Sequence, residues 1–564
     1  MRVTRRPRVQ KAGRLAAGIA ALALATAGCG APSANGGSGA GQSAQSGSKG
    51  RIILTASSTT TGPLTDNFNP FSPTSAFVDG GTDLIYEPLY QFDSLDPAKI
   101  LPWLSTSYQW GDGGKSLTVH LRHGVKWSDG KPFTSADVVF TFDLLKRFPA
   151  LDTNGVPIVS ASAKGPSEAV LRFSSPQYAN FQFIGGQFIV PKHLWQSIKN
   201  PAKSTNKHPV GTGPFVLQSF SSEAFLLTKN THYWQPGKPQ FYGIRFLQYS
   251  SAQSGALALG AGQLDWASYF FPHMRQTYLD KSSYYHNWDP SVGLIMLIPN
   301  LTRYPLNLLD VRKAIDVAIN RAFIVKTGEE NLLKPAASPT GLALPADARY
   351  ISSQYRSAHT SYDPSEARRL LEAAGLKQVN GKFVGQHGPI KLSIMVTGAD
   401  ADLTLDDQII ANELNAVGLS TSVQTVSPEA WTSERALGNF DLTLLPDGSS
   451  VPYLNYRYLL SSGLTAPIGK NAANNYGRWQ DKHTDALLAR YAATNDPKQQ
   501  QAALDGLEAT MVQQVPDIPV CYFPDWAQYS TKQLVGWPTP ANPYWSPAVY
   551  EQPEVVALHL HSRS

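Results

Sequence analysis

The sequence has few cysteines, few charged residues and no apolar run long enough to cross a bilayer. Cys29 and Cys521 are its two cysteines, so the fold must be stable without a disulfide framework. Charged residues make up 16% of the 564 residues, whereas 42% are hydrophobic and 10% aromatic. This composition provides apolar material for two or more packed domains and for an aromatic-rich interior or cleft.

Motifs of hydrolytic enzymes are absent as well. The sequence has no Gly-x-Ser-x-Gly elbow, and His193 and His208 lack the glutamate-bearing helical spacing of a zinc protease. Asp406 and Asp407 would be glycosidase carboxylates only if folding placed two carboxyl groups across a sugar. Near a helix start, such acids are more typical of solvated partners of the helix dipole. We therefore expect no enzyme activity, no cofactor and no metal site.

Positive charge is concentrated at the N-terminus. The chain has 48 lysines and arginines against 42 aspartates and glutamates, but six of the cations precede Cys29, where no acid occurs. The remaining chain is balanced, with 42 residues of each sign and no basic stripe. This balance argues against a nucleic-acid partner.

Residues 1–28 have the order of an export signal, with cations first, then the apolar residues 15–27, then Ala27 and Gly28. The apolar part has about 13 residues, fewer than the ~20 that span a bilayer. The end of this segment resembles the lipobox of bacterial lipoproteins, although Thr26 stands where leucine is preferred. The resemblance implies lipidation of Cys29, with the Gly/Ser tether of residues 29–50 holding the protein at the outer face of the cytoplasmic membrane or in the periplasm. The alternative is an ordinary secretory signal with an incidental cysteine.

Helices and strands are predicted to alternate after the tether, which is typical of α/β or α+β domains. Alternation over 116–122 predicts a half-buried strand, and Thr134 with Asp137 predicts a capped helix start. Residues 66–71, which contain Asn-Pro between aromatics, predict a rigid exposed turn. Further helices are expected after Asp310, Asp363-Pro364 and Asp496-Pro497, and strands over 51–56 and 419–423.

An ordered set of motifs carries a family resemblance over nearly everything after the tether. Residues 117–138, LTVHLRHGVKWSDGKPFTSADV, resemble the hallmark of the family 5 extracellular solute-binding proteins, the peptide, dipeptide and nickel receptors of ABC importers. Further matching stretches are 209–215 (PVGTGPF), 229–234 (KNTHYW), 262–265 (GQLD), 311–315 (VRKAI), 362–375, 474–476 (NNY) and 516–520 (PDIPV). Physically, the two glycines of Gly211-Thr212-Gly213-Pro214 indicate a positive φ or a close backbone approach rather than a phosphate loop.

The resemblance implies a two-lobe periplasmic-binding-protein-like fold of the large type. Lobe one would take residues 51–290 and 520–564, with an extra subdomain at about 86–203, and lobe two residues 291–519. The lobes would close on a ligand by hinge motion, as a monomer, and deliver it to membrane permease and ATPase subunits.

Asp447 is the principal candidate for ligand binding. In peptide-binding members an aspartate shortly after a strand of the second lobe pairs with the ligand's α-ammonium group, and Asp447 resembles it. A carboxylate there selects for a free N-terminus, because an unpaired buried ammonium is costly. Peptide-binding members usually continue with a tyrosine and an Asp-Pro pair, whereas this chain has Gly448-Ser449-Ser450-Val451-Pro452-Tyr453. A turn at Asp447-Gly448 is the alternative explanation.

Aromatic residues near the expected cleft form a second set of candidates. Such side chains cover apolar peptide groups or stack on sugar faces, although each also suits core packing. Asn67 in the first loop would contact ligand or form a turn. The aromatic candidates are Trp266, Tyr269, Trp431, Tyr453 and Tyr456.

These features predict an importer receptor for oligopeptides or dipeptides. An oligosaccharide receptor of the same family is the main alternative. A glycosidase tethered to the envelope and a lipoprotein that senses a peptide without importing it are further hypotheses.

Overall fold

The computed structural model describes residues 51–61, 63–152, 154–398, 401–447 and 451–563. The predicted signal peptide, Cys29 and the tether lie outside the described residues. Within the described part, no helix has both the length and the apolar character needed to cross a membrane.

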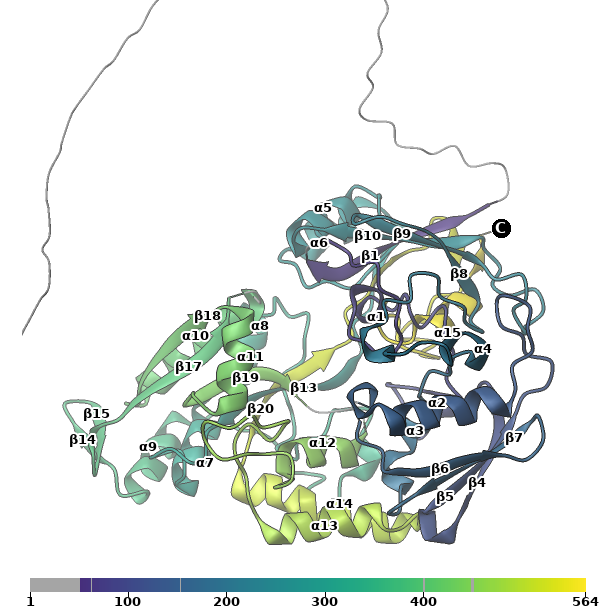
Figure 1. Ribbon diagram of the computed structural model, residues 1–564. Coiled ribbons are helices and arrows are strands. Elements are labelled where there is room, and N and C mark those ends of the chain that lie inside the picture. Colours follow the sequence, from purple (N-terminus) through teal and green to yellow (C-terminus); the bar gives the residue numbers. More distant parts are fainter. Residues whose placement is uncertain (1–50, 62, 153, 399–400, 448–450, 564) are drawn as a thin grey trace, which may run out of the picture. The chain divides into compact units, whose positions relative to one another are not determined.

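A seven-stranded sheet is assembled from three separate parts of the chain (Figure 1). Its central strand β1 (Ile53–Thr61) runs parallel to β10 (Gly243–Tyr249) on one side and to β11 (Trp266–Ala267) on the other. The remaining strands are β8 (Phe215–Phe220), β9 (Ala224–Lys229), β12 (Tyr285–Asn287) and β21 (Gln528–Ser530). The associated helices are α1 (Ser75–Val78), α5 (Ala252–Gly260), α6 (Met274–Thr277) and α15 (Pro553–His559).

A four-stranded antiparallel sheet lies within residues 105–173 and carries helix α2 (Ser135–Arg147) on one face (Figure 1). Its strands are β4 (Ser105–Gly111), β5 (Ser116–Leu121), β7 (Glu168–Phe173) and β6 (Ile158–Ala163). Smaller elements nearby are β2 (Tyr90–Phe92), β3 (Ile100–Pro102), α3 (Phe181–Gly185) and α4 (Lys192–Trp195). One continuous hydrophobic core joins this sheet to the seven-stranded one.

A five-stranded sheet forms the framework of the middle of the chain. Its order is β18 (Ser420–Val426), β17 (Lys391–Thr397), β19 (Leu442–Asp447), β13 (Ser291–Pro299) and β20 (Ile518–Pro524). Alternate residues of β13 enter different cores, Ile295 and Leu297 on one face and Leu294 and Met296 on the other. Both faces are therefore buried, which explains why β13 is a continuous apolar run rather than an alternating one.

Eight helices and a small sheet accompany the five-stranded sheet in the described part of residues 300–517. In Figure 1, α10 lies beside β17 and β18, and α7 and α9 lie below β17. The helices are α7 (Leu309–Ala318), α8 (Arg321–Thr327), α9 (Pro364–Ala373), α10 (Ala401–Ala416), α11 (Pro428–Leu437), α12 (Pro452–Leu460), α13 (Lys482–Ala492) and α14 (Pro497–Gln514). The small sheet contains β14 (Lys377–Val379), β15 (Lys382–Gly385) and β16 (Gly388–Pro389).

The chain passes between the two large sheets at residues 288–290 and again at 525–527. Two large sheets with flanking helices form the α/β two-lobe arrangement that we expect from the sequence. The predicted boundary at 519–520 falls inside β20, however. The apolar residues from Ile518 to Tyr522 continue pairing with β13, and the chain leaves the sheet only after Pro524.

The start of helix α9 is as the sequence predicts, and it provides a stability test. Asp363 Oδ1 accepts hydrogen bonds from the backbone N–H groups of Ser365 and Glu366, both at 2.9 Å. Losing an N-cap of this kind costs about 1 kcal/mol. We expect Asp363→Ala to lower the free energy of unfolding by about that amount in urea titrations. The matched control Ser365→Ala should change it by less than about 0.5 kcal/mol, and equal effects of the two variants would contradict the capping role.

The predicted exposed turn at 66–71 is wrong in its exposure. Phe68 is buried and packs edge-on against Phe225, with ring centroids 5.5 Å apart. Asn69 is buried because its amide donates to the carbonyls of Pro201 and Ser204, at 2.8 and 2.9 Å. The loop is therefore held against the 201–204 segment, a contact that local sequence does not encode.

The expectation that Asp406 and Asp407 are solvated is also wrong. Both side chains are 0% exposed, although they lie on helix α10. The helix turns this side toward the interior, where Asp406 contacts Gly328.

Candidate functional site

The two segments that connect the sheets lie side by side and are hydrogen-bonded to each other. Trp288 N–H donates to the carbonyl of Ala527 at 3.1 Å, and Asp525 N–H donates to the carbonyl of Pro290 at 2.9 Å. Asp289 Oδ1 accepts from Ala527 N–H at 2.9 Å. These contacts make one narrow double connection between the two halves of the fold, which we call the junction.

A cavity of about 950 Å³ lies beside the junction, and we call it the junction cavity. Both halves of the fold line it. The first contributes residues from the loop between β2 and β3, and the second contributes residues from 332–334 and 345–349. Trp288 to Ser291 and Pro524 line it at the junction itself, and Pro540 and Pro543 complete the wall. A volume of this size lies within the range of small-molecule sites.

The walls of the junction cavity carry charges of both signs. Lys99 Nζ lies 2.8 Å from Asp93 Oδ2 and donates to the carbonyl of Tyr544 at 2.6 Å. Arg349, from the second half of the fold, forms an ion pair with Asp96 from the first. Both side chains of the second pair are about half exposed. Its contribution to stability is therefore small, but it joins the two halves across the cavity.

Asp289 gives the junction a dependence on pH. Burial, opposed by its hydrogen bonds and reinforced by the nearby Asp525, raises the pKa of Asp289 to about 7. The folded state thus holds the proton more tightly than the unfolded chain. Its stabilising contribution is complete below about pH 4 and is lost as the pH rises through about 7.

We expect Asp289→Asn to change this dependence in a definite direction. Relative to the unchanged chain, the variant should gain thermal stability as the pH increases from 4 to 8, because asparagine never ionises. Melting curves followed by circular dichroism at several pH values measure the difference. The exposed Asp280→Asn serves as the control, and curves for Asp289→Asn that run parallel to the unchanged chain would contradict the assignment.

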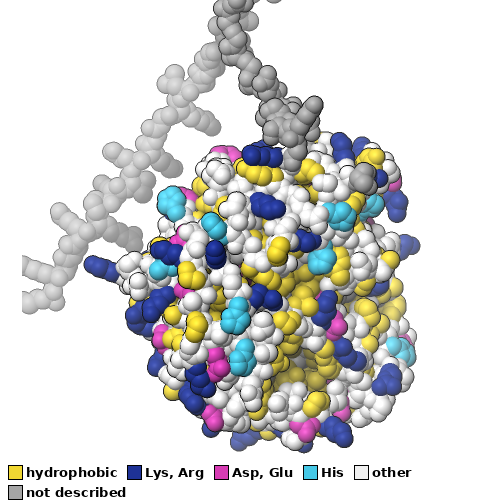
Figure 2. Space-filling model, turned by 90° about the vertical axis from the view of Figure 1, so that its right-hand side faces the viewer, with side chains coloured by type: hydrophobic (Ala, Val, Ile, Leu, Met, Phe, Trp, Pro, Cys, Tyr) yellow, Lys and Arg dark blue, Asp and Glu magenta, His cyan; other side chains and the backbone are white. Residues whose placement is uncertain are grey.

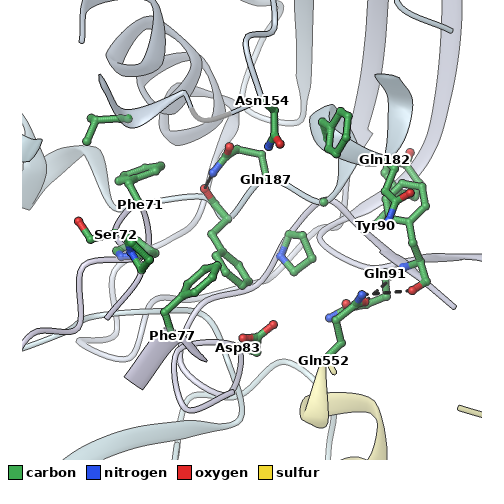
Figure 3. A pocket seen from close by; sticks show the side chains of 18 residues that line it. Phe71, Ser72, Phe77, Asp83, Tyr90, Gln91, Asn154, Gln182, Gln187 and Gln552 are labelled. Carbon is green, nitrogen blue, oxygen red and sulfur yellow. Dashed lines mark hydrogen bonds between the residues drawn. The ribbon is translucent and has the colours of Figure 1, made fainter. Parts of the chain in front are cut away.

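A second, smaller pocket of about 360 Å³ lies in the first half of the fold (Figure 3). Aromatic rings and side-chain amides line it, and Figure 3 shows Asp83 near Phe77 and Gln552. Burial raises the pKa of Asp83 to about 7. Gln552 is held by its amide, which donates to the carbonyl of Phe92 at 3.2 Å. The chemistry of this pocket is that of aromatic faces beside amide donors and acceptors.

The outer surface carries no large field of one sign on the face seen in Figure 2. Basic and acidic side chains are interspersed there, and hydrophobic side chains line a hollow. This distribution agrees with the balanced charge count after residue 28.

Asp447 is the last residue of β19 and pairs in register with Leu294. Its side chain and residues 448–450 lie outside the described part. β13 begins at Ser291 and pairs there with Pro524, so the end of β19, the start of β13 and the end of β20 meet at the same end of the sheet. Asp447 and the junction cavity therefore border this end of the five-stranded sheet.

Trp431 forms part of an aromatic and cationic stack. Its indole N–H donates to Thr443 Oγ1 of β19 at 3.1 Å, and the guanidinium of Arg435 lies 4.0 Å from its ring centroid. The same guanidinium lies 4.5 Å from the ring of Tyr476. Trp431 as a whole is half-buried.

The other predicted aromatics are largely buried. Tyr453 is 6% exposed and stacks on Tyr491 with centroids 4.5 Å apart, and Tyr456 is fully buried and donates to the carbonyl of Thr340 at 3.0 Å. Both belong to the same hydrophobic cluster as the neighbours of β19. Their aromatic rings thus serve to pack the hydrophobic core against the five-stranded sheet.

Trp266, Tyr269 and Asn67 lie in the first half of the fold. Trp266 is 0% exposed, and its indole donates to the carbonyl of Pro547 at 2.7 Å. Tyr269 is 7% exposed, and its ring packs against Gly255 of α5. Asn67 is half-buried and its Oδ1 accepts from Asn69 N–H at 3.0 Å, as in an Asx turn. In this conformation the side chain of Trp266 offers a ligand no surface.

Sequence reasoning missed the charged residues of the junction cavity. Asp93, Asp96 and Lys99 occur in a short polar loop. Arg349, which contacts Asp96, follows 253 positions later in the sequence. The signal that could have drawn attention to the loop is its turn-forming composition, Asp-Ser-Leu-Asp-Pro, and that signal predicts no ligand.

A family model for the bacterial extracellular solute-binding proteins, family 5, matches residues 99–465. This match spans more than half of the chain. The chain belongs to family 5 of the extracellular solute-binding proteins. It is thus a substrate-binding protein of an ABC importer, and the resemblance carried by the sequence motifs is confirmed.

Curated relatives of this family 5 protein bind different solutes. It is 24% identical over 485 residues to a nickel-binding periplasmic protein of Escherichia coli K12, covering 83% of this chain and 88% of that protein. It is 25% identical over 475 residues to a glutathione-binding protein of Shigella flexneri serotype 5b, covering 80% and 86%. These names describe binding proteins rather than enzymes.

Solved structures agree with the family assignment. A periplasmic oligopeptide-binding protein of an ABC transporter from Thermotoga maritima matches with a TM-score of 0.82 and 25% identity, over 91% of this chain and 99% of that one. A mannohexaose-bound structure of an oligopeptide-binding protein from the same organism matches with a TM-score of 0.77 and 25% identity, over 91% and 98%. The predicted periplasmic-binding-protein-like fold is confirmed.

Proposed function

We propose that this receptor binds oligopeptides or dipeptides with a free N-terminus, between its two lobes, and delivers them unchanged to a membrane permease. The observation that carries the proposal is the junction cavity, which both halves of the fold line and which the double connection borders. A ligand held there contacts both halves, so its binding favours one arrangement of the two lobes over the others. The permease would recognise that arrangement.

The charges that line the junction cavity favour a zwitterionic ligand. A peptide carries an ammonium group at one end and a carboxylate at the other, and the cavity offers carboxylates at Asp93 and Asp96 beside the cations Lys99 and Arg349. In our proposal Asp447 pairs with the ammonium group. Trp431 covers an apolar side chain of the peptide, and Asn67 helps to shape the first loop.

An oligosaccharide ligand is the second candidate. The mannohexaose in the similar Thermotoga maritima structure favours it, as do the aromatic and amide groups of the smaller pocket. Sugars are bound by aromatic faces combined with amide hydrogen bonds and need no charged partner. The two candidates therefore differ in their dependence on charge.

Export and anchoring complete the proposal. Residues 1–28 act as the signal peptide, and lipidated Cys29 holds the protein at the outer face of the cytoplasmic membrane through the Gly/Ser tether. Mass spectrometry of the protein purified from its membrane fraction tests this step. An unmodified Cys29, or a chain still beginning at Met1, would contradict it.

Calorimetry separates the peptide and sugar candidates. Unblocked peptides of two to six residues should bind, their N-acetylated forms should bind at least tenfold more weakly, and mannohexaose should not compete. Equal binding of blocked and unblocked peptides would contradict recognition of the N-terminus. Binding of mannohexaose with no binding of any peptide would favour the sugar receptor instead.

A further inference from the structure

Three buried side chains from distant parts of the sequence converge within the five-stranded-sheet half of the fold. Glu329 follows helix α8, Asp406 lies on helix α10 and Cys521 lies on strand β20. All three are 0% exposed, and one donor atom from each lies within 4.8 Å of the others. Among the described residues, this is the group whose geometry suits a metal ion.

The two carboxyl groups of this cluster lie beside each other, and no other described group donates a hydrogen bond to them. Both oxygens of Glu329 and both oxygens of Asp406 are buried without a partner. The nearby guanidinium of Arg321 is engaged elsewhere, since it donates to the carbonyl of Pro519 at 2.7 Å and to that of Asp316 at 3.0 Å. Native proteins rarely leave buried carboxyl oxygens unpaired, because each costs about 1–3 kcal/mol or more.

The backbone is shaped to admit the Asp406 carboxyl group. A Cβ atom on Gly328 would lie only 1.8 Å from Asp406 Oδ1, so glycine is required beside it.

We propose that Glu329, Asp406 and Cys521 bind one divalent cation of the zinc class as a structural site, separate from the solute-binding cleft. A thiolate with carboxylates suits Zn²⁺ or a similar borderline-soft ion, whereas Ca²⁺ and Mg²⁺ prefer oxygen donors alone. Zinc bonds of about 2.0–2.3 Å require the three donor atoms to close in slightly around the ion. Binding would replace the protons of the three groups and satisfy the unpaired oxygens.

The site would fasten a segment that lines the junction cavity. Residues 332–334 contribute to the cavity wall three positions after Glu329, and Pro335 forms a bridge with Cys521 itself. A cation joining Glu329, Asp406 and Cys521 therefore fixes the start of this segment against α10 and β20. It would stabilise the second half of the fold without touching the solute.

Metal content and cobalt spectroscopy test the proposal. The full chain, carrying Cys29→Ser so that Cys521 is its only thiol, is purified without chelators and analysed for metals. After removal of any metal, Zn²⁺ and Co²⁺ are titrated. We expect one equivalent of Zn²⁺ with a Kd in the micromolar range or below, and a thiolate-to-cobalt charge-transfer band on adding Co²⁺.

Three variants assign the ligands. Cys521→Ala should abolish the cobalt band, and Glu329→Gln should weaken Zn²⁺ binding at least tenfold. Glu508→Gln, which removes a buried carboxylate of helix α14 outside the cluster, should leave both unchanged. Because either ligand variant could fail to fold, the band in the otherwise unchanged chain is the primary measurement. Absence of the band, together with no binding of Zn²⁺ at 100 μM, roughly a hundred times the expected Kd, would overturn the proposal and leave the cluster as buried neutral acids.

Discussion

Asp447→Asn is expected to weaken the binding of unblocked peptides by about 30-fold to 1,000-fold. Removing one partner of a desolvated charge pair costs about 2–4 kcal/mol, much of it because the other charge remains buried and unpaired. Asparagine keeps the size of the side chain and its carbonyl oxygen but loses the negative charge. Isothermal titration calorimetry with a peptide and its N-acetylated form measures the effect.

The acetylated peptide is the internal control for this prediction. It lacks the ammonium group, so Asp447→Asn should change its affinity by less than about threefold, which corresponds to roughly 0.6 kcal/mol. Asp280→Asn removes an exposed carboxylate that pairs with Arg275 in the other half of the fold, and it should leave both affinities unchanged. Equal losses for both peptides would show that Asp447 supports the turn after β19 rather than binding the ammonium group.

Gly211→Ala is expected to lower the free energy of unfolding by about 3 kcal/mol or more. An alanine Cβ at this position would lie 1.7 Å from the carbonyl oxygen of Ile85, which is backbone and cannot rotate away. The loop is fixed in place, because Gly213 N–H donates to that same carbonyl at 2.9 Å and Asn230 Nδ2 donates to Gly213 O at 2.8 Å. The backbone must therefore separate. Urea and thermal unfolding measure the loss.

Gly463→Ala is the matched control. Gly463 is exposed and has no positive φ, and the nearest atom to its added Cβ is Ser461 Oγ at 3.6 Å. This substitution should change the free energy of unfolding by less than about 0.5 kcal/mol. If Gly211→Ala were equally mild, the close approach of the two backbones would not constrain the motif.

Local features of the fold were predictable because local interactions cause them. Asp363 caps α9 through hydrogen bonds to residues two and three positions later, and Thr134 with Asp137 caps α2 in the same way. The strand at 116–121 alternates because one face packs on the core, with Leu117 and Val119 fully buried. The family motifs predicted the two-lobe fold because their order along the chain is preserved.

The candidate site was less predictable, because its parts meet only after folding. The loop at 66–71 resembles an exposed turn until Asn69 binds the carbonyls of Pro201 and Ser204. Trp266 resembles a ligand platform until Trp537 packs against it, with the two ring centroids 5.2 Å apart. Each residue type suits both environments, and only the packing partner distinguishes them.

By itself, the sequence determined the helix starts and the membership in family 5 and predicted an export signal, since these depend on neighbouring residues or on the order of motifs. The tertiary structure alone decided that Asp96 meets Arg349 across the junction cavity and that Glu329, Asp406 and Cys521 share one buried space. Such contacts join residues separated by tens to hundreds of positions. Their energies arise from burial and from the close approach of charged groups, both of which exist only once the chain has folded.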